Sequence, residues 1–170
     1  MESISRFSGQ NLSSVLSVEV TTPDNVAELS EPTDGGLIIN PSDLSFADEA
    51  AVVTIVGTRD KCSFACNEIQ TEHGSSYSCE VLMEVPKNQR TTGENLWGMS
   101  RLDLFMVIHL ANDVDRVIGG VNENEHVTLK VDEQVDAATI GENKYILRFG
   151  WESAHPPYYI SSHVVFGGDS

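Results

Sequence analysis

The sequence predicts an all-β protein, an antiparallel β-sandwich or jelly roll of about eight strands with an extended N-terminal arm. Two observations predict this class. Apolar and polar residues alternate with a period of two in several segments, as in strands that have one buried and one solvated face. The segments between them contain Gly, Pro, Asn and Asp, the residues that turns require. We therefore expect residues 1–35 to form the arm and residues 36–170 to form a single β-sandwich domain.

The expected arm differs in composition from the rest of the chain. The stretch "FSGQNLSSVLSVEVTTPDNVAELSEPTDGG" is rich in Ser, Thr, Asn, Pro and Gly, with one candidate strand at residues 15–21. Such a segment has too few apolar residues to form a core of its own. We expect it to lie against a neighbouring subunit, and a disordered tail is the alternative.

The strand pattern is regular from residue 36 onward. Three segments alternate clearly: "YSCEVLMEV" at 77–85, "HVTLKV" at 126–131 and "YILRFGW" at 145–151. One wet face and one apolar face favour antiparallel pairing. Shorter candidate strands are "LIIN" at 37, "AVVTIVG" at 51 and "YYISSHVVF" at 158.

The most apolar stretch, "SRLDLFMVIHLANDVDRVIGG" at 100–120, fits two structures. As a helix, Ser100 would be its N-cap and Gly119 its end. As a hairpin, two strands would flank a turn at Asn112-Asp113. The β-branched residues and the strands expected on both sides favour the hairpin.

The chain is strongly acidic, with 26 acidic and 10 basic residues and a net charge of -16. Such a surface repels phosphate backbones, so we expect no direct binding to nucleic acid. The N-terminus has no basic segment followed by an apolar run, so we expect no secretory signal peptide. The apolar runs are too short to cross a bilayer, so we expect no membrane partner.

Four soft ligands have a spacing that zinc could use: Cys62, Cys66, His73 and Cys79. However, Cys79 lies in an alternating strand, where a buried thiol behaves as a small apolar side chain. Three cysteines are also an odd number, which does not favour a disulfide framework. We expect structural cysteines without a metal.

Two carboxylate-rich segments, "NDVD" at 112–115 and "NENE" at 122–125, would lie in adjacent loops of the hairpin structure. Ca²⁺ prefers several oxygen ligands, so the candidate calcium site consists of Asp113, Asp115, Glu123 and Glu125. Solvated turns are the alternative interpretation. We expect no other cofactor.

We expect no enzymatic activity. The motifs G-x-S-x-G, H-E-x-x-H and G-x-G-x-x-G and the P-loop are missing from the sequence, and its five histidines form no recognisable catalytic pattern.

Aromatic residues offer a candidate contact surface. Trp97 and Trp151 could stack on sugar rings, together with two tyrosines of the segment "HPPYY". However, Trp151 falls on the core-facing series of its strand, so we expect its burial instead. Two prolines would hold that segment extended, so we expect an interface made of Pro156, Pro157, Tyr158 and Tyr159.

These features together favour a non-enzymatic, self-assembling structural subunit, and most directly a virus or phage virion protein such as a capsid, decoration or tail component. Its partners would be other copies of itself and other virion proteins, and its location the virion, after assembly in the host cytoplasm. The alternative is a β-sandwich ligand-binding module, with carbohydrate as the first candidate ligand. A small hydrolase or isomerase on a cupin-like barrel is a third possibility.

Overall fold

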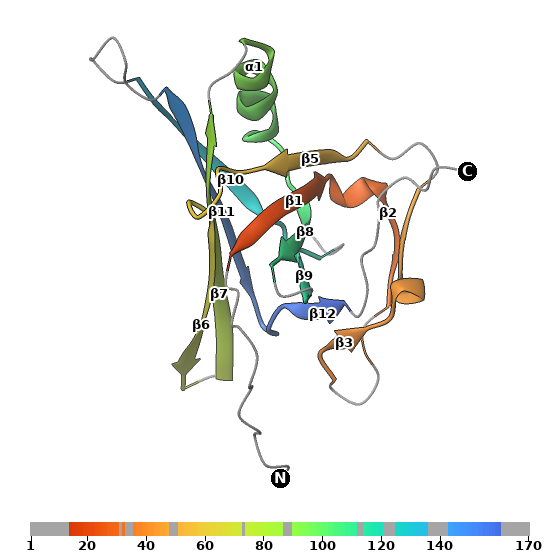
Figure 1. Ribbon diagram of the computed structural model, residues 1–170. Coiled ribbons are helices and arrows are strands. Elements are labelled where there is room, and N and C mark those ends of the chain that lie inside the picture. Colours follow the sequence, from red (N-terminus) through yellow and green to blue (C-terminus); the bar gives the residue numbers. More distant parts are fainter. Residues whose placement is uncertain are drawn as a thin grey trace.

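The protein is mostly β-structure, with several sheets (Figure 1). The computed structural model describes residues 14–30, 32, 36–47, 51–72, 74–86, 90–111, 114–120, 125–135 and 143–160. The strands of these residues are β1 (Val15–Thr21), β2 (Val26–Leu29), β3 (Ile38–Ile39), β4 (Leu44–Phe46), β5 (Val53–Val56), β6 (Ser63–Thr71), β7 (Gly74–Pro86), β8 (Phe105–Leu110), β9 (Asp115–Ile118), β10 (Thr128–Gln134), β11 (Lys144–Ser153) and β12 (Tyr158–Ile160). The helices are α1 (Arg90–Met99) and the short 3-10 helices η1 (Pro23–Asn25) and η3 (Pro41–Asp43).

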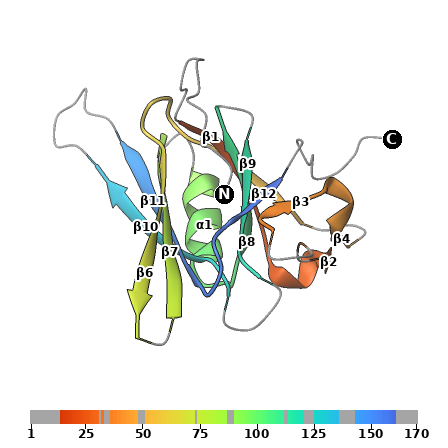
Figure 2. The same cartoon turned by 90° about the horizontal axis from the view of Figure 1, so that it is seen from below.

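The strands form three sheets. A six-stranded sheet has the order β3-β12-β9-β8-β1-β5, in which only β12 and β3 are parallel neighbours. A four-stranded antiparallel sheet has the order β10-β11-β7-β6, and β2 pairs with β4 in a two-stranded sheet. Figure 2 shows β8 and β9 between the four-stranded sheet on one side and the β2–β4 pair on the other.

Two hydrophobic clusters hold these layers together. The larger cluster lies between the four-stranded and six-stranded sheets and includes Val18, Met106, Val81, Leu147 and Phe149. The smaller cluster lies between the other face of the six-stranded sheet and the β2–β4 pair. Its members are Val26, Ile39, Leu44, Phe105, Val107, Val117, Tyr158 and Ile160.

Residues 100–118 contain the predicted hairpin. β8 and β9 pair antiparallel, with Met106 opposite Ile118. β8 is buried on both faces, because Phe105 and Val107 face one cluster while Met106 and Ile108 face the other. A strand that is covered on both sides is a continuous apolar run, and this is why its sequence also fitted a helix.

The expectation of an arm over residues 1–35 is corrected for the described part of that range. β1 lies between β8 and β5 in the six-stranded sheet, and its Val15, Val18 and Val20 are buried. β2 pairs with β4. A few core-facing valines are enough to place a polar segment inside a sheet, although its average composition suggested an exposed arm. Residues 1–13 lie outside the described residues.

The three alternating segments are confirmed as strands of the four-stranded sheet, and their apolar residues face the core. The described residues form twelve strands where about eight were expected, because several have only two to four residues. Helix α1 was not expected, since Gly93 and Gly98 lower its helix propensity. Leu96 of α1 is buried in the larger cluster. Among the described residues, no helix has the length and apolarity needed to span a membrane.

Candidate functional site

Only two of the four residues of the predicted calcium site lie among the described residues. Asp113 and Glu123 lie outside the described residues. Asp115 is buried on β9 beside His109, whereas the Glu125 carboxylate accepts a hydrogen bond from the Ser153 hydroxyl at 3.5 Å and lies 3.8 Å from His155 Nε2. The two described carboxylates therefore have different partners. Within the described ranges, no three His, Cys, Asp or Glu side chains gather in an arrangement that could hold a metal ion.

The predicted interface at residues 156–159 is largely inside the protein. Tyr158 is only 6% exposed and belongs to the smaller hydrophobic cluster, and Pro157 is also buried. Tyr159 is exposed, with the Arg116 guanidinium 3.6 Å from the centre of its ring, and Pro156 is half-buried. The expectation that all four residues form a surface is therefore corrected. β12 pairs with β9 and β3, so its alternate side chains must face a core.

The candidate sugar-stacking residues lie in different environments. Trp151 is 2% exposed in the core, and its indole Nε1 donates to the Glu125 carbonyl at 2.9 Å. Trp97, on α1, is 45% exposed. The burial of Trp151 expected from the alternation of its strand is therefore confirmed, and Tyr158 is also buried and unavailable for stacking.

The cysteines are structural, but they are not three separate thiols. Cys66 on β6 and Cys79 on β7 are directly opposite and form a disulfide. Cys62 is a free, buried thiol that contacts the Thr58 carbonyl at 3.5 Å, and burial raises its pKa. His73, the fourth candidate zinc ligand, lies outside the described residues. The three cysteines therefore form one disulfide and leave one thiol, although their odd number did not suggest a disulfide.

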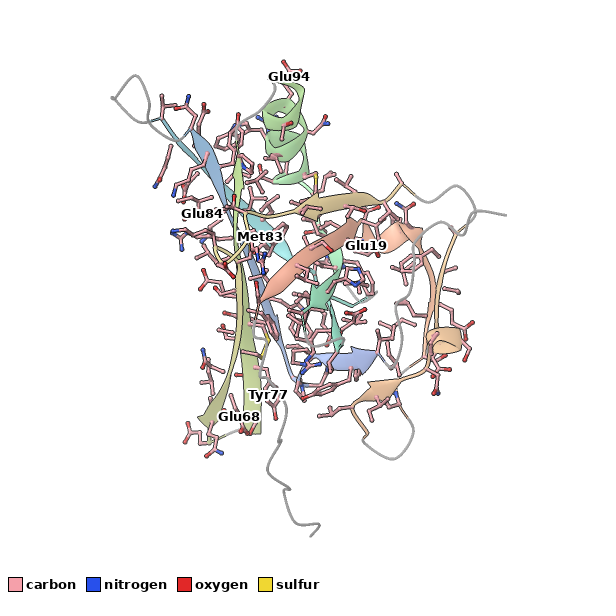
Figure 3. The ribbon with its side chains drawn as sticks, viewed as in Figure 1. Glu19, Glu68, Tyr77, Met83, Glu84 and Glu94 are labelled. Atoms are coloured by element: carbon pink, nitrogen blue, oxygen red, sulfur yellow. A yellow bond between two sulfur atoms is a disulfide. The ribbon has the colours of Figure 1, made fainter. Side chains whose placement is uncertain are left out.

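A buried cluster that the sequence did not suggest joins three neighbouring strands of the six-stranded sheet. Its members are Glu19 on β1, His109 on β8 and Asp115 on β9 (Figure 3 labels Glu19). The His109 Nδ1 atom lies 3.0 Å from a carboxylate oxygen of Asp115, and Nε2 lies 3.3 Å from a carboxylate oxygen of Glu19. The side chain of Asp115 is 1% exposed, and those of Glu19 and His109 are each 13% exposed.

The electrostatics of this cluster favour a protonated imidazole. The hydrogen bond to Glu19 is the main cause that raises the pKa of His109 above its ordinary value of 6.5. Burial acts in the opposite direction, and the Asp115 carboxylate adds to the increase. An imidazolium between two carboxylates can hold a proton and join three strands. We expect this cluster to make the stability of the sheet depend on pH.

The outer face of the four-stranded sheet contains a shallow polar hollow of about 440 Å³. Gly150 has no side chain to fill it, and a Cβ atom there would meet only the Thr128 hydroxyl, at 3.4 Å. Arg148 crosses this face between Glu80 and Asp132, at 3.7 Å and 3.5 Å. Such a mixed-charge surface can donate and accept hydrogen bonds.

The exposed apolar side chains follow a pattern that alternation alone does not predict. Of the nine large exposed apolar side chains of the described residues, four lie on edge strands: Ile38 on β3, Val53 and Val56 on β5, and Ile69 on β6. Leu16 and Tyr159 lie on inner strands, and Trp97 and Leu102 lie outside the sheets. Val135, 64% exposed, directly follows the edge strand β10. Edge strands also carry backbone groups that have no neighbouring strand on one side. The sheet edges therefore carry or adjoin five of the nine large exposed apolar side chains of the described residues.

Comparisons of this chain with models of protein families, with curated proteins and with solved structures find no match.

Proposed function

We propose that the protein is a non-enzymatic, self-assembling structural subunit of the kind that builds virions, as a capsid, decoration or tail component. The observation that carries this proposal is that edge strands of both larger sheets present exposed apolar side chains, on β3, β5 and β6 and directly after β10. Its partners are other copies of itself and other virion proteins, without direct contact to nucleic acid. Its place is the virion, after assembly in the host cytoplasm. The proposed body is a two-sheet sandwich of the broad class that includes jelly rolls.

Charges commonly protect an edge strand from pairing, and three edge strands of the two larger sheets have one charged residue or none. β3, with the sequence II, has no charged residue. β5, at one edge of the six-stranded sheet, has the sequence VTIV and no charged residue. β6, at one edge of the four-stranded sheet, has only Glu68. By contrast, β10 at the opposite edge carries Lys130, Asp132 and Glu133. A subunit with two open edges can contact two neighbours, which is the minimum for a ring or filament.

The net charge of -16 opposes such contacts. Subunits of like charge repel one another, and salt weakens this repulsion because the Debye length shortens to about 8 Å at 0.15 M ionic strength. Assembly should therefore strengthen as salt rises, in contrast to phosphate binding by basic proteins, which weakens.

Light scattering on the full chain, over a range of protein, NaCl and CaCl₂ concentrations, tests the proposal. We expect the particle mass to rise with protein and salt concentration, and electron microscopy to show regular particles. A mobility-shift assay with DNA and RNA should show no complex. A protein that stays monomeric throughout, or that binds nucleic acid tightly at physiological salt, would contradict the proposal.

A second candidate function, a ligand-binding module with carbohydrate as the first ligand, is favoured by the polar hollow on the four-stranded sheet. Hydrogen-bonding side chains around a hollow of this size suit a small polar ligand. A glycan array followed by calorimetry tests it. Binding to a monomer, lost in Gly150→Leu because that side chain would fill the hollow, would favour this function over self-assembly.

A further inference from the structure

We infer that the edge strand β6 pairs antiparallel with β6 of a second copy, about a twofold axis at Asn67, so that the two four-stranded sheets become one continuous sheet. This inference rests on the proposed function, because it names the partner and the contact through which self-assembly occurs.

β6 has the geometry that strand addition needs. It is nine residues long and pairs with β7 on one side, at the end of the sheet order β10-β11-β7-β6. Most of its residues are exposed, including Ile69 at 47%. Figure 1 shows β6 at the outer side of the four-stranded sheet, and Figure 3 shows Glu68 near the far end of the β6–β7 hairpin. A second strand can therefore approach along its whole length.

The register with β7 fixes which backbone groups face the open side. Cys66 lies opposite Cys79 with a Cα–Cα distance of 4.0 Å, the short spacing typical of a pair that exchanges no backbone hydrogen bonds. The amide and carbonyl of Cys66 therefore point away from β7. By alternation, the amides and carbonyls of Phe64, Glu68 and Gln70 also point toward the open edge.

An axis at Asn67 uses all four of these residues. It places Phe64 opposite Gln70 of the second copy, and Cys66 opposite Glu68 of the second copy. Each such pair exchanges two hydrogen bonds, so the twofold contact forms about eight. A shift of the register by two residues leaves at least one of these residues without a partner across the axis. The symmetric register is therefore the one that satisfies the most backbone groups.

The side chains are compatible with this register. On the outer face, Ile69 lies opposite Ala65 of the second copy, and this contact occurs twice and covers an exposed apolar side chain. The one charged residue of the strand, Glu68, lies opposite Cys66 and not opposite itself. The contact therefore adds no directly opposed pair of like charges.

The charges next to the strand are complementary across the axis. The segment Arg59-Asp60-Lys61, with two basic residues and one acidic residue, precedes β6, and Glu72 follows β6 in the hairpin turn. Continuing the same register places residue 62 opposite Glu72 of the second copy. The turn at residues 58–61, which precedes residue 62 and has a net charge of +1, would then lie near this carboxylate. The pairing occurs twice by symmetry. In a chain of net charge -16, this is a place where two copies attract one another.

Sedimentation equilibrium of the full chain tests the inference with a matched pair of variants. Ile69→Lys places a charge in the contact, whereas Leu102→Lys makes the same change at an equally exposed residue outside it. We expect Ile69→Lys to weaken dimer formation by roughly two- to thirtyfold, because two cross-strand contacts are lost, and Leu102→Lys to leave it unchanged or slightly stronger. Circular dichroism checks that both variants fold.

A charge exchange tests the register itself. In the double variant Ala65→Glu with Ile69→Lys, opposite charges face each other across the axis, and dimer formation should recover to within about threefold of the parent. In Ala65→Lys with Ile69→Lys, like charges meet and dimers should be lost. Equal effects at residues 69 and 102, or no recovery on charge exchange, would overturn the β6 contact while self-assembly stands. A parent chain that never associates would overturn both proposals.

Discussion

Replacing His109 by Gln should destabilise the protein strongly at mildly acidic pH and only weakly at alkaline pH. Gln keeps a polar side chain of similar length but cannot carry the positive charge that lies between Glu19 and Asp115. Asp115, 1% exposed, would then keep its buried carboxylate without the imidazolium. Removing one partner of a buried ion pair costs more than the pair contributes, because the remaining charge stays away from water.

The size of the destabilisation by His109→Gln and its pH dependence follow from the burial of the cluster and from the raised pKa of His109. Loss of a partner from a buried pair costs about 3 kcal/mol at the lower end of the usual range, which suits side chains that keep 13% exposure. Because the pKa of His109 is raised in the folded protein, its stabilisation is fully present below about pH 6.5 and is lost as pH rises through the folded value. At alkaline pH the neutral imidazole keeps one hydrogen bond, so the difference in the free energy of unfolding between the parent and His109→Gln should fall to about 1 kcal/mol.

Urea unfolding of the parent and of His109→Gln, near pH 6 and near pH 9, measures this difference. His126→Gln is the control, because His126 pairs with Asp103, whose side chain is 69% exposed, and such pairs contribute little. A difference for His109→Gln that is independent of pH, or that grows toward alkaline pH, would show that the imidazole is not held as a cation.

Three other measurements check separate parts of the structure. Gly119→Ala should cost about 1–3 kcal/mol in urea unfolding, because Gly119 has φ +99° and its Cβ would lie 3.2 Å from the Phe105 Cα, whereas Gly98→Ala, with open space around it, should be neutral or slightly stabilising. Thiol titration of the denatured, unreduced chain should find one thiol, Cys62, and finding three would contradict the Cys66–Cys79 disulfide. Iodide should quench the fluorescence of Trp151→Phe, which retains the exposed Trp97, far more than that of Trp97→Phe, and equal quenching would contradict the burial of Trp151.

The strands of the four-stranded sheet could be predicted because each has one wet and one buried face, so that alternation reports directly on burial. β8 was ambiguous because hydrophobic clusters cover both of its faces. β1 was assigned to an arm because Val15, Val18 and Val20 are few among polar neighbours, and its place in the sheet depends on pairing with β8, far along the chain. Local patterns do not contain that information.

The contacts of the candidate site likewise depend partly on local sequence and partly on strand pairing between distant segments. The hairpin prediction was enough to bring His109 near Asp115, since the two residues flank its turn. The hairpin prediction did not place Glu19 beside His109, because that contact depends on the pairing of β1 with β8. Asp115 was chosen as an oxygen ligand for Ca²⁺, but the group beside it is the His109 imidazole, whose pKa is raised. The acidic composition of the chain made a cation site the more obvious interpretation.

Hydrogen exchange of the backbone amides of β6, at low and high protein concentration, tests the central claim of assembly through the sheet edges most directly. The amides of Phe64, Cys66, Glu68 and Gln70 should exchange rapidly in the monomer and become protected as the particle mass rises. The alternate β6 amides, which face β7, should be protected at both concentrations. An increase in particle mass without added protection of these four amides would contradict the β6 contact, and a mass that never increases would contradict self-assembly itself.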